Sequence, residues 1–328
     1  PPVQQTGAVK WVRENLFSNW INSILTILSI YFVVKIILAS TPWMWNGVWT
    51  TSSLRECREV LQGTSGACWS VLTERWNQML FGFQYPVEAY WRPTLAFVLL
   101  LVCIAPVLFQ KLPRKMLIFS AIYPFLAFWL IWGGTLLTPV IVGLSLIAGY
   151  VAFVKTERLI GFATGLLSGV VAVALVLYLG SFVTAALSGF IALEPVASRD
   201  MGGFMLNLIL GTVCVSLSIP LGIVLALGRQ SNMPIIKGIC VVFIEFIRGV
   251  PLITLLFVAN VVLSYFFPPG TNLDLILRVI IMITLFSAAY IAEVIRGGLA
   301  ALPRGQYEAA DSLGLDYPQA MRLIILPQ

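Results

Sequence analysis

The chain has 328 residues, of which 59% are hydrophobic and only 10% are charged, and its mean hydropathy is +0.94. Soluble domains carry about 25% charged residues, so this composition excludes an ordinary water-soluble protein and indicates lipid as the main solvent. The net charge of +6 comes from basic residues in short gaps between apolar stretches, which is typical of membrane-protein loops and not of a nucleic-acid surface. Histidine is absent, which excludes histidine-centred triads, metal sites and proton relays.

Eight apolar stretches approach the roughly 20 residues that an α-helix needs to cross a bilayer. They predict an all-α fold, a polytopic bundle of about eight transmembrane helices. In chain order the predicted spans are 21–38, 94–109, 116–132, 139–154, 159–178, 203–227, 251–267 and 277–294.

Basic residues alternate from gap to gap along this series. They gather before the first span, between the second and third, the fourth and fifth, and the sixth and seventh, and after the last. The positive-inside rule therefore predicts a cytoplasmic N-terminus, a cytoplasmic segment after the eighth span and a long periplasmic loop over about 40–92.

The stretch 234–267 is too long for a single span. Pro251 removes a helical hydrogen bond and biases the two residues before it away from helix. We expect a shallow helix up to about Ile247, a break, and then the seventh span. A broken helix persists at membrane depth only where protein or a water-filled cavity covers the freed backbone, so the break marks a candidate passage.

Two acid–base pairs lie near the predicted inner ends of the helices. Glu245 with Arg248, and Glu293 with Arg296, have the i, i+3 spacing that places both side chains on one helix face. Each pair can neutralise its charges at the interface or form a gate, and the sequence leaves both roles open.

Several polar residues interrupt the apolar stretches around the break and in the last span. Helices normally turn such groups toward the bundle interior, where they line a pathway or make interhelical hydrogen bonds. The candidates for the pathway are Arg248, Thr254, Asn260, Ser287, Tyr290 and Glu293.

Two of the five cysteines, Cys57 and Cys68, share the long loop assigned to the oxidising periplasmic side. We expect a disulfide between them, with two free thiols as the alternative. No metal site is expected.

The last residues after the eighth span form a polar segment with helical signals. Pro303 suits a first helical turn, residues 306–313 form a short amphipathic helix, and Gly314 is placed to end it. Asp316 with Pro318 can start a second helix. Two short helices joined at a glycine suit docking into a groove of a partner.

This segment resembles the EAA loop of ABC import permeases at every fixed position and spacing. The matching residues are Glu308, Ala309, Ala310, Gly314, Ile324, Leu326 and Pro327. The resemblance implies a coupling helix that sits in a cleft of an ATPase subunit, with Glu308 and Ala309 in contact with that ATPase and Gly314 forming the turn.

Upstream residues narrow the resemblance. The sequences EFIRGVPL at 245–252 and AYIAEVIRGG at 289–298 are similar to those of the polar amino acid permeases. Residues 1–200, with additional spans and the long loop, resemble the enlarged membrane subunit of general L-amino acid importers. We therefore expect N-terminal spans over 1–200 and a permease core over 201–328, incomplete at its C-terminus because the family has one or two further spans.

The resemblance implies a bacterial inner-membrane subunit that passes an amino acid from a periplasmic binding protein to the cytoplasm. Its expected partners are an ABC ATPase, a second permease subunit, the binding protein and the lipid bilayer, with no nucleic acid. No GxxxxGK[ST] sequence occurs, so the chain lacks a phosphate-binding loop. We therefore expect that it is not an enzyme and binds no cofactor, and that the separate ATPase subunit hydrolyses ATP.

An ion-coupled secondary transporter is the main alternative. Such proteins place carboxylates within their spans, and here Glu245 and Glu293 each have an arginine three residues later. An intramembrane enzyme would need a convergent nucleophile or metal set, which the spans lack. Transport assays with and without the ATPase distinguish the two transporter classes.

Overall fold

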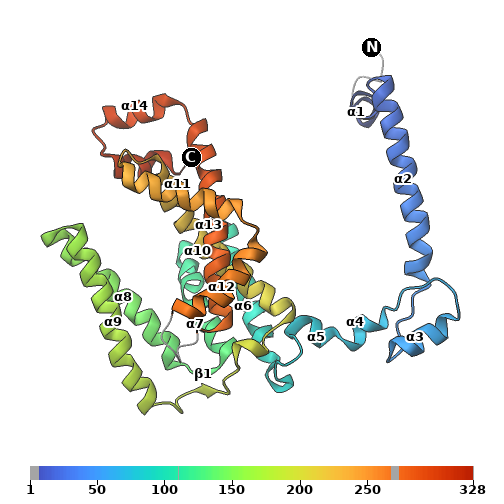
Figure 1. The fold of residues 1–328 in the computed structure, drawn as a ribbon, viewed down its shortest axis with the longest axis horizontal. Coiled ribbons are helices and arrows are strands. Elements are labelled where there is room, and N and C mark those ends of the chain that lie inside the picture. Colours follow the sequence, from blue (N-terminus) through green and yellow to red (C-terminus); the bar gives the residue numbers. More distant parts are fainter. Residues whose placement is uncertain (1–6, 110, 267–272, 328) are drawn as a thin grey trace. The chain divides into compact units, whose positions relative to one another are not determined.

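The computed structural model describes residues 7–109, 111–266 and 273–327, and within them it is helical apart from one pair of two-residue strands (Figure 1). The chain forms two compact units, residues 1–77 and 78–328, which are described separately. A helical fold follows from the composition, because a helix satisfies its own backbone hydrogen bonds in lipid.

The first unit is built on one long apolar helix. Its helices are α1 (Ala8–Asn15), α2 (Trp20–Trp45), α3 (Leu54–Leu61) and α4 (Ser70–Glu74). The side chain of Asn19 accepts a hydrogen bond from the backbone N–H of Asn22 at 2.8 Å and so caps the start of α2. With 26 residues, α2 extends about 39 Å, which is enough to cross a bilayer.

The loop that follows α2 is closed by covalent and aromatic contacts. Cys57 on α3 forms a disulfide with Cys68, their Cα atoms lie 6.1 Å apart, and the Cys57 side chain is fully buried. Val48 pairs with Cys68 in an isolated parallel bridge, and the ring of Trp49 stacks on that of Trp69 with centroids 5.6 Å apart. These contacts fold the loop back on itself without a large apolar core.

The first half of the second unit contains four long helices and several short elements. They are α5 (Trp76–Phe81, at the boundary of the units), η2 (Val87–Ala89), α6 (Trp91–Leu108), η3 (Arg114–Met116), α7 (Leu117–Trp132), β1 (Gly134–Thr135), α8 (Leu137–Ile160), α9 (Phe162–Ala186), β2 (Ala192–Leu193) and η4 (Ser198–Asp200). Strand β1 pairs antiparallel with β2. Helices α8 and α9 lie side by side as a hairpin (Figure 1). A Cβ added at Gly149 or at Gly169 would lie 3.1 Å from the other's carbonyl oxygen, so this close approach depends on glycine.

The second half of this unit surrounds a tight helix pair. Its elements are α10 (Gly203–Gln230), α11 (Pro234–Gly249), α12 (Leu252–Phe266), α13 (Leu275–Ala301), α14 (Arg304–Ser312), α15 (Tyr317–Ala320) and the π-helical turn η5 (Met321–Ile325). Helix α10 packs along α13, where a Cβ added at Gly222 would lie 3.0 Å from Cβ of Ile291. Ala226, Ala288 and Ala292 are almost completely buried at the same contact. Small side chains thus bring the two backbones close together.

Seven helices of the described residues are long and apolar enough to cross a membrane, and α11 with α12 adds an eighth span if the bent pair counts as one. This confirms the predicted all-helical bundle of about eight spans. The short predicted span 139–154 is in fact the 24-residue helix α8.

The predicted seventh span needs a correction. The break expected after Ile247 is present, because α11 ends at Gly249, α12 begins at Leu252, and the two helices bend by 107°. Within the described residues helix α12 covers 15 residues, about 22 Å, and it passes as a span only together with α11. Residue 267 lies outside the described residues.

We predict that the Cys57–Cys68 disulfide protects both thiols from alkylation. In the denatured, non-reduced protein we expect maleimide labelling of Cys103, Cys214 and Cys240, which the structure shows as free and which serve as the internal control. Replacing both Cys57 and Cys68 by serine should lower the stability of the loop by about 2–3 kcal/mol, because it opens an 11-residue link. Five labelled thiols before reduction would contradict the prediction.

Candidate functional site

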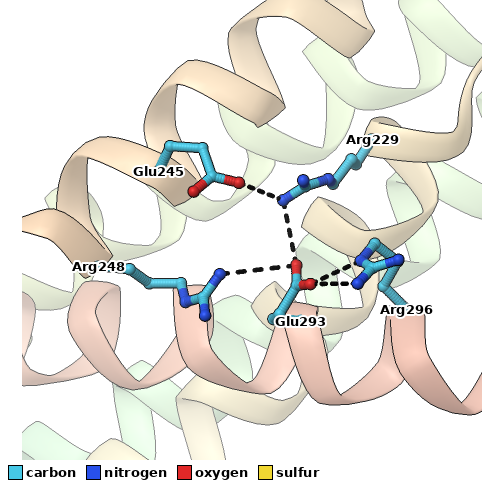
Figure 2. A network of polar contacts seen from close by, with 5 residues as sticks. All are labelled: Arg229, Glu245, Arg248, Glu293 and Arg296. Atoms are coloured by element: carbon cyan, nitrogen blue, oxygen red, sulfur yellow. Dashed lines mark hydrogen bonds and ion pairs between the residues drawn. The ribbon is translucent and has the colours of Figure 1, made fainter.

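Five charged side chains from three helices meet where α10, α11 and α13 approach one another (Figure 2). We call them the charge cluster: Arg229 at the end of α10, Glu245 and Arg248 on α11, and Glu293 and Arg296 on α13. Glu293 lies eight residues before the end of α13, from which the C-terminal segment (residues 303–327) continues.

Glu293 is the centre of the charge cluster. Its Oε1 accepts a hydrogen bond from Nε of Arg296 at 2.7 Å and forms an ion pair with Nη2 of the same arginine at 2.5 Å. Its Oε2 lies 3.1 Å from Nη1 of Arg229 and 3.8 Å from Nη1 of Arg248. The side chain is only 21% exposed, and a carboxylate that has lost much of its water requires such donors to remain ionised.

The predicted Glu293–Arg296 pair is therefore present, but the predicted Glu245–Arg248 pair is wrong. Glu245 instead binds Nη1 of Arg229 at 2.9 Å, while Arg248 turns toward Glu293. An i, i+3 pair on one helix contributes only about 0.2–0.5 kcal/mol, too little to hold Glu245 to Arg248 when Arg229 of α10 lies 2.9 Å from Glu245.

Arg229 was missed in the sequence because it was assigned to a loop. It forms part of the last turn of α10, and its guanidinium bridges the carboxylates of Glu245 and Glu293 (Figure 2). The sequence indicated the role of Arg229 only indirectly. Two carboxylates beside spans need cationic partners, and Arg229 is the basic residue at the end of the neighbouring span.

Three of the six pathway candidates come together in the structure. The guanidinium carbon of Arg248 lies 5.5 Å from the centroid of the Tyr290 ring, and Glu293 is one turn further along α13. Ser287 is half-buried one turn before Tyr290, and Thr254 is exposed on α12.

Asn260 lies elsewhere, toward the other end of α12. Its side-chain oxygen accepts a hydrogen bond from Nη1 of Arg278 at 3.2 Å. Both residues border a hollow of about 220 Å³ between α12 and α13 that is lined mainly by apolar side chains.

The C-terminal segment has the predicted helix–turn–helix form. Helix α14 begins at Arg304, with Pro303 as its N-cap, and Gly314 follows it with a φ of +69°, the left-handed conformation that favours glycine. The Asp316 carboxylate then accepts a hydrogen bond from the backbone N–H of Gln319 at 2.9 Å and caps α15.

The C-terminal segment packs against the membrane helices on one side only. Met321 and Ile325 are buried against Leu299 of α13, and Leu227 of α10 and Ile295 of α13 complete this apolar cluster. In the motif itself, Ala310 is buried and Ile324 is half-buried, whereas the remaining motif residues are exposed: Glu308, Ala309, Gly314, Leu326 and Pro327. The buried residues attach the segment, and the exposed ones are free to meet another molecule.

Among residues 7–109, 111–266 and 273–327, no group of three or more histidine, cysteine, aspartate or glutamate side chains could hold a metal ion.

Comparisons with known proteins agree on one class. The family described as binding-protein-dependent transport system inner membrane component matches residues 218–328, which include the charge cluster and the C-terminal segment. The glutamate/glutamine/aspartate/asparagine transport system permease protein BztC of Rhodobacter capsulatus is 52% identical over 100% of this chain and 77% of its own length. The inner membrane amino-acid ABC transporter permease protein YhdY of Escherichia coli K12 is 38% identical over 98% of this chain and 72% of its own length. A crystal structure of an amino acid ABC transporter with histidines is 35% identical over 38% of this chain and 56% of that chain, with a TM-score of 0.34.

We predict that Glu293→Gln destabilises the protein more than Glu245→Gln. Loss of the Glu293 charge leaves three arginines without their shared partner and should cost about 1.5–3 kcal/mol, the range for hydrogen bonds to charged groups. Glu245 has a 53% exposed side chain and one pair, so the matched change should cost less than about 1 kcal/mol. Thermal unfolding of both purified variants in detergent measures the difference, and equal shifts would contradict the central place given to Glu293.

Proposed function

The chain belongs to the amino acid permeases of binding-protein-dependent ABC uptake systems, and we propose that its C-terminal segment transmits the movement of the partner ATPase to the charge cluster. It is a multi-pass inner membrane protein, and its system includes an ATPase and a binding protein. The permease subunit is not itself an ATPase and binds no cofactor.

One observation carries this proposal: the C-terminal segment is attached to α10 and α13 by buried residues and leaves Glu308, Ala309 and Gly314 of the EAA-like motif exposed. Helix α14 has nine residues, too few to be stable alone, so packing must hold it in place. Glu308 is exposed on this helix and can pair with a basic residue of the ATPase. Ala309 beside it and Gly314 at the turn allow close approach of a partner.

The proposal also covers the orientation of the chain in the membrane, a second permease subunit and the class of substrate. We assign the N-terminus and the C-terminal segment to the cytoplasm, because positive charge gathers in the gaps on that side. A second permease subunit, identical or homologous, completes the pathway. The name of the relative from Rhodobacter capsulatus suggests acidic amino acids and their amides as substrates.

The proposed pathway runs along the break between α11 and α12 and the facing side of α13. Arg248, Tyr290 and Glu293 lie together there, with Thr254 and Ser287 on the adjoining stretches of α12 and α13. Asn260 and Arg278 form a separate polar contact further along the same two helices. We propose that the amino acid contacts these groups in passing.

We predict that Glu308→Lys weakens coupling to the ATPase without affecting membrane insertion. A reversed charge at the interface should reduce ATP-driven uptake about tenfold or more, equivalent to a loss of about 1.4 kcal/mol of coupling. Uptake and stimulated ATP hydrolysis are measured in proteoliposomes that contain the complete system. Glu88→Lys, the same reversal at an exposed position of η2, is the control and should transport normally. Normal ATP-driven uptake by Glu308→Lys would refute the coupling role assigned to Glu308.

Gly314 offers a separate test of the turn. Valine at a φ of +69° is strained by about 1–2 kcal/mol, so Gly314→Val should impair uptake, whereas Gly314→Asn should retain it because asparagine tolerates this conformation. A Cβ at this position meets no atom within 4 Å, so any difference between the two variants reports backbone conformation and not a clash.

The pathway is tested by Thr254→Val and Ser287→Ala. Each removes one hydroxyl with little change in shape, and we expect an altered uptake rate or an altered preference among amino acids. Thr41→Val, an equivalent change in the first unit, is the control. If both pathway variants match the wild type in rate and preference, these two residues do not line the route.

A further inference from the structure

The charge cluster contains an excess cation. Three guanidinium groups face two carboxylates, which leaves one positive charge unbalanced within the cluster (Figure 2). Arg229 and Arg296 bind their carboxylates at 2.5–3.1 Å, whereas Arg248 lies 3.8 Å from Glu293. The loosely held cation is thus Arg248.

Neighbouring side chains hold Arg248 in place without satisfying its whole hydrogen-bonding capacity. Its Nε is buried and has no hydrogen-bond partner among the described residues, although its side chain as a whole is 32% exposed. Tyr290 lies 5.5 Å from the guanidinium and provides a ring face that orients the planar group. A planar guanidinium matches a carboxylate in a two-bond arrangement.

The surroundings of Arg248 also provide acceptors. It lies in the last turn of α11, directly before the break, and the carbonyl groups of a last turn have no donor from their own helix. Val250 leaves the helix with φ −108° and ψ 131°, and Pro251 has no N–H to donate. Helix ends at a break within the membrane are suited to binding the charged groups of a substrate.

We infer that Arg248 binds the α-carboxylate of the transported amino acid, taking it in exchange for Glu293, while the α-ammonium group lies at the last-turn carbonyls of α11. The inference rests on the proposed function of this chain and adds the chemical group that is recognised. A bound carboxylate balances the excess charge of the cluster. The group is common to all amino acids, so this contact recognises the class and leaves the choice among side chains to other residues.

The test compares glutamine with glutaminol, in which an alcohol replaces the carboxylate and the side chain is unchanged. The purified complex of full-length permease and ATPase, without the binding protein, is titrated with each compound, and apparent affinities are obtained from the shift in unfolding temperature. For the wild type we expect glutamine to bind about tenfold to a hundredfold more tightly than glutaminol, the range for a charged hydrogen-bonded pair.

Variants then identify the recognising residue. Arg248→Gln should lose this preference and bind both compounds weakly, and Arg248→Lys should retain part of it because the charge remains and the fork is lost. Arg199→Gln removes an exposed guanidinium outside the charge cluster and is the matched control, which should keep the preference. Size-exclusion chromatography verifies that each variant still assembles with the ATPase.

The outcomes separate the inference from the proposed function. A wild-type complex that does not distinguish the two compounds, or that neither compound stabilises at millimolar concentration, overturns the inference. The same holds if Arg248→Gln keeps the wild-type preference. The proposed function is judged independently by ATP-driven uptake of glutamine with the binding protein present, so its failure and that of the inference give different results.

Discussion

The half-buried carboxylate of Glu293 sets the requirement that organises the second half of the chain. A carboxylate at this depth is stable only with cations close by, and they come from α10, α11 and α13 itself. The arrangement requires α10 and α13 to run close together, which Gly222, Ala226 and Ala292 allow. The small residues and the charge cluster therefore depend on each other: the close contact brings Arg229 to Glu293, and the ion pairs fix the angle and register of the helices.

Apolar packing connects this cluster to the C-terminal segment. Ile295 belongs to two adjoining groups of side chains, one containing Ile244 of α11 and the other containing Met321 and Ile325 of the C-terminal segment. It is also two residues from Glu293 on the same helix. Close-packed side chains move together, because interiors have no free volume to absorb a displacement. A shift of the C-terminal segment must therefore move α13 at the level of the cluster or separate buried apolar surface.

Turns, caps and helix breaks can be predicted from the sequence, whereas contacts between helices cannot. The turn at Gly314, the cap at Asp316 and the break at Pro251 were predictable, since each follows from the conformational preference of one residue and its neighbours. The partners of Glu245 and Arg248 were not, because an i, i+3 spacing on α11 gives no information on how near Arg229 lies on α10. The shortness of α12 was likewise hidden, since hydropathy measures apolar length and is unaffected by a 107° bend.

Two independent requirements converge at the break between α11 and α12. The backbone groups released there have no partners within their helices, and lipid offers none, so they must face protein or water. Arg248, directly before the break, carries a charge that lipid solvates as poorly as it solvates the freed backbone groups. Tyr290 and Glu293 of α13 cover one side of this point and leave the Arg248 side chain about one-third exposed. The exposed side of Arg248 must accordingly face an aqueous or protein-lined space.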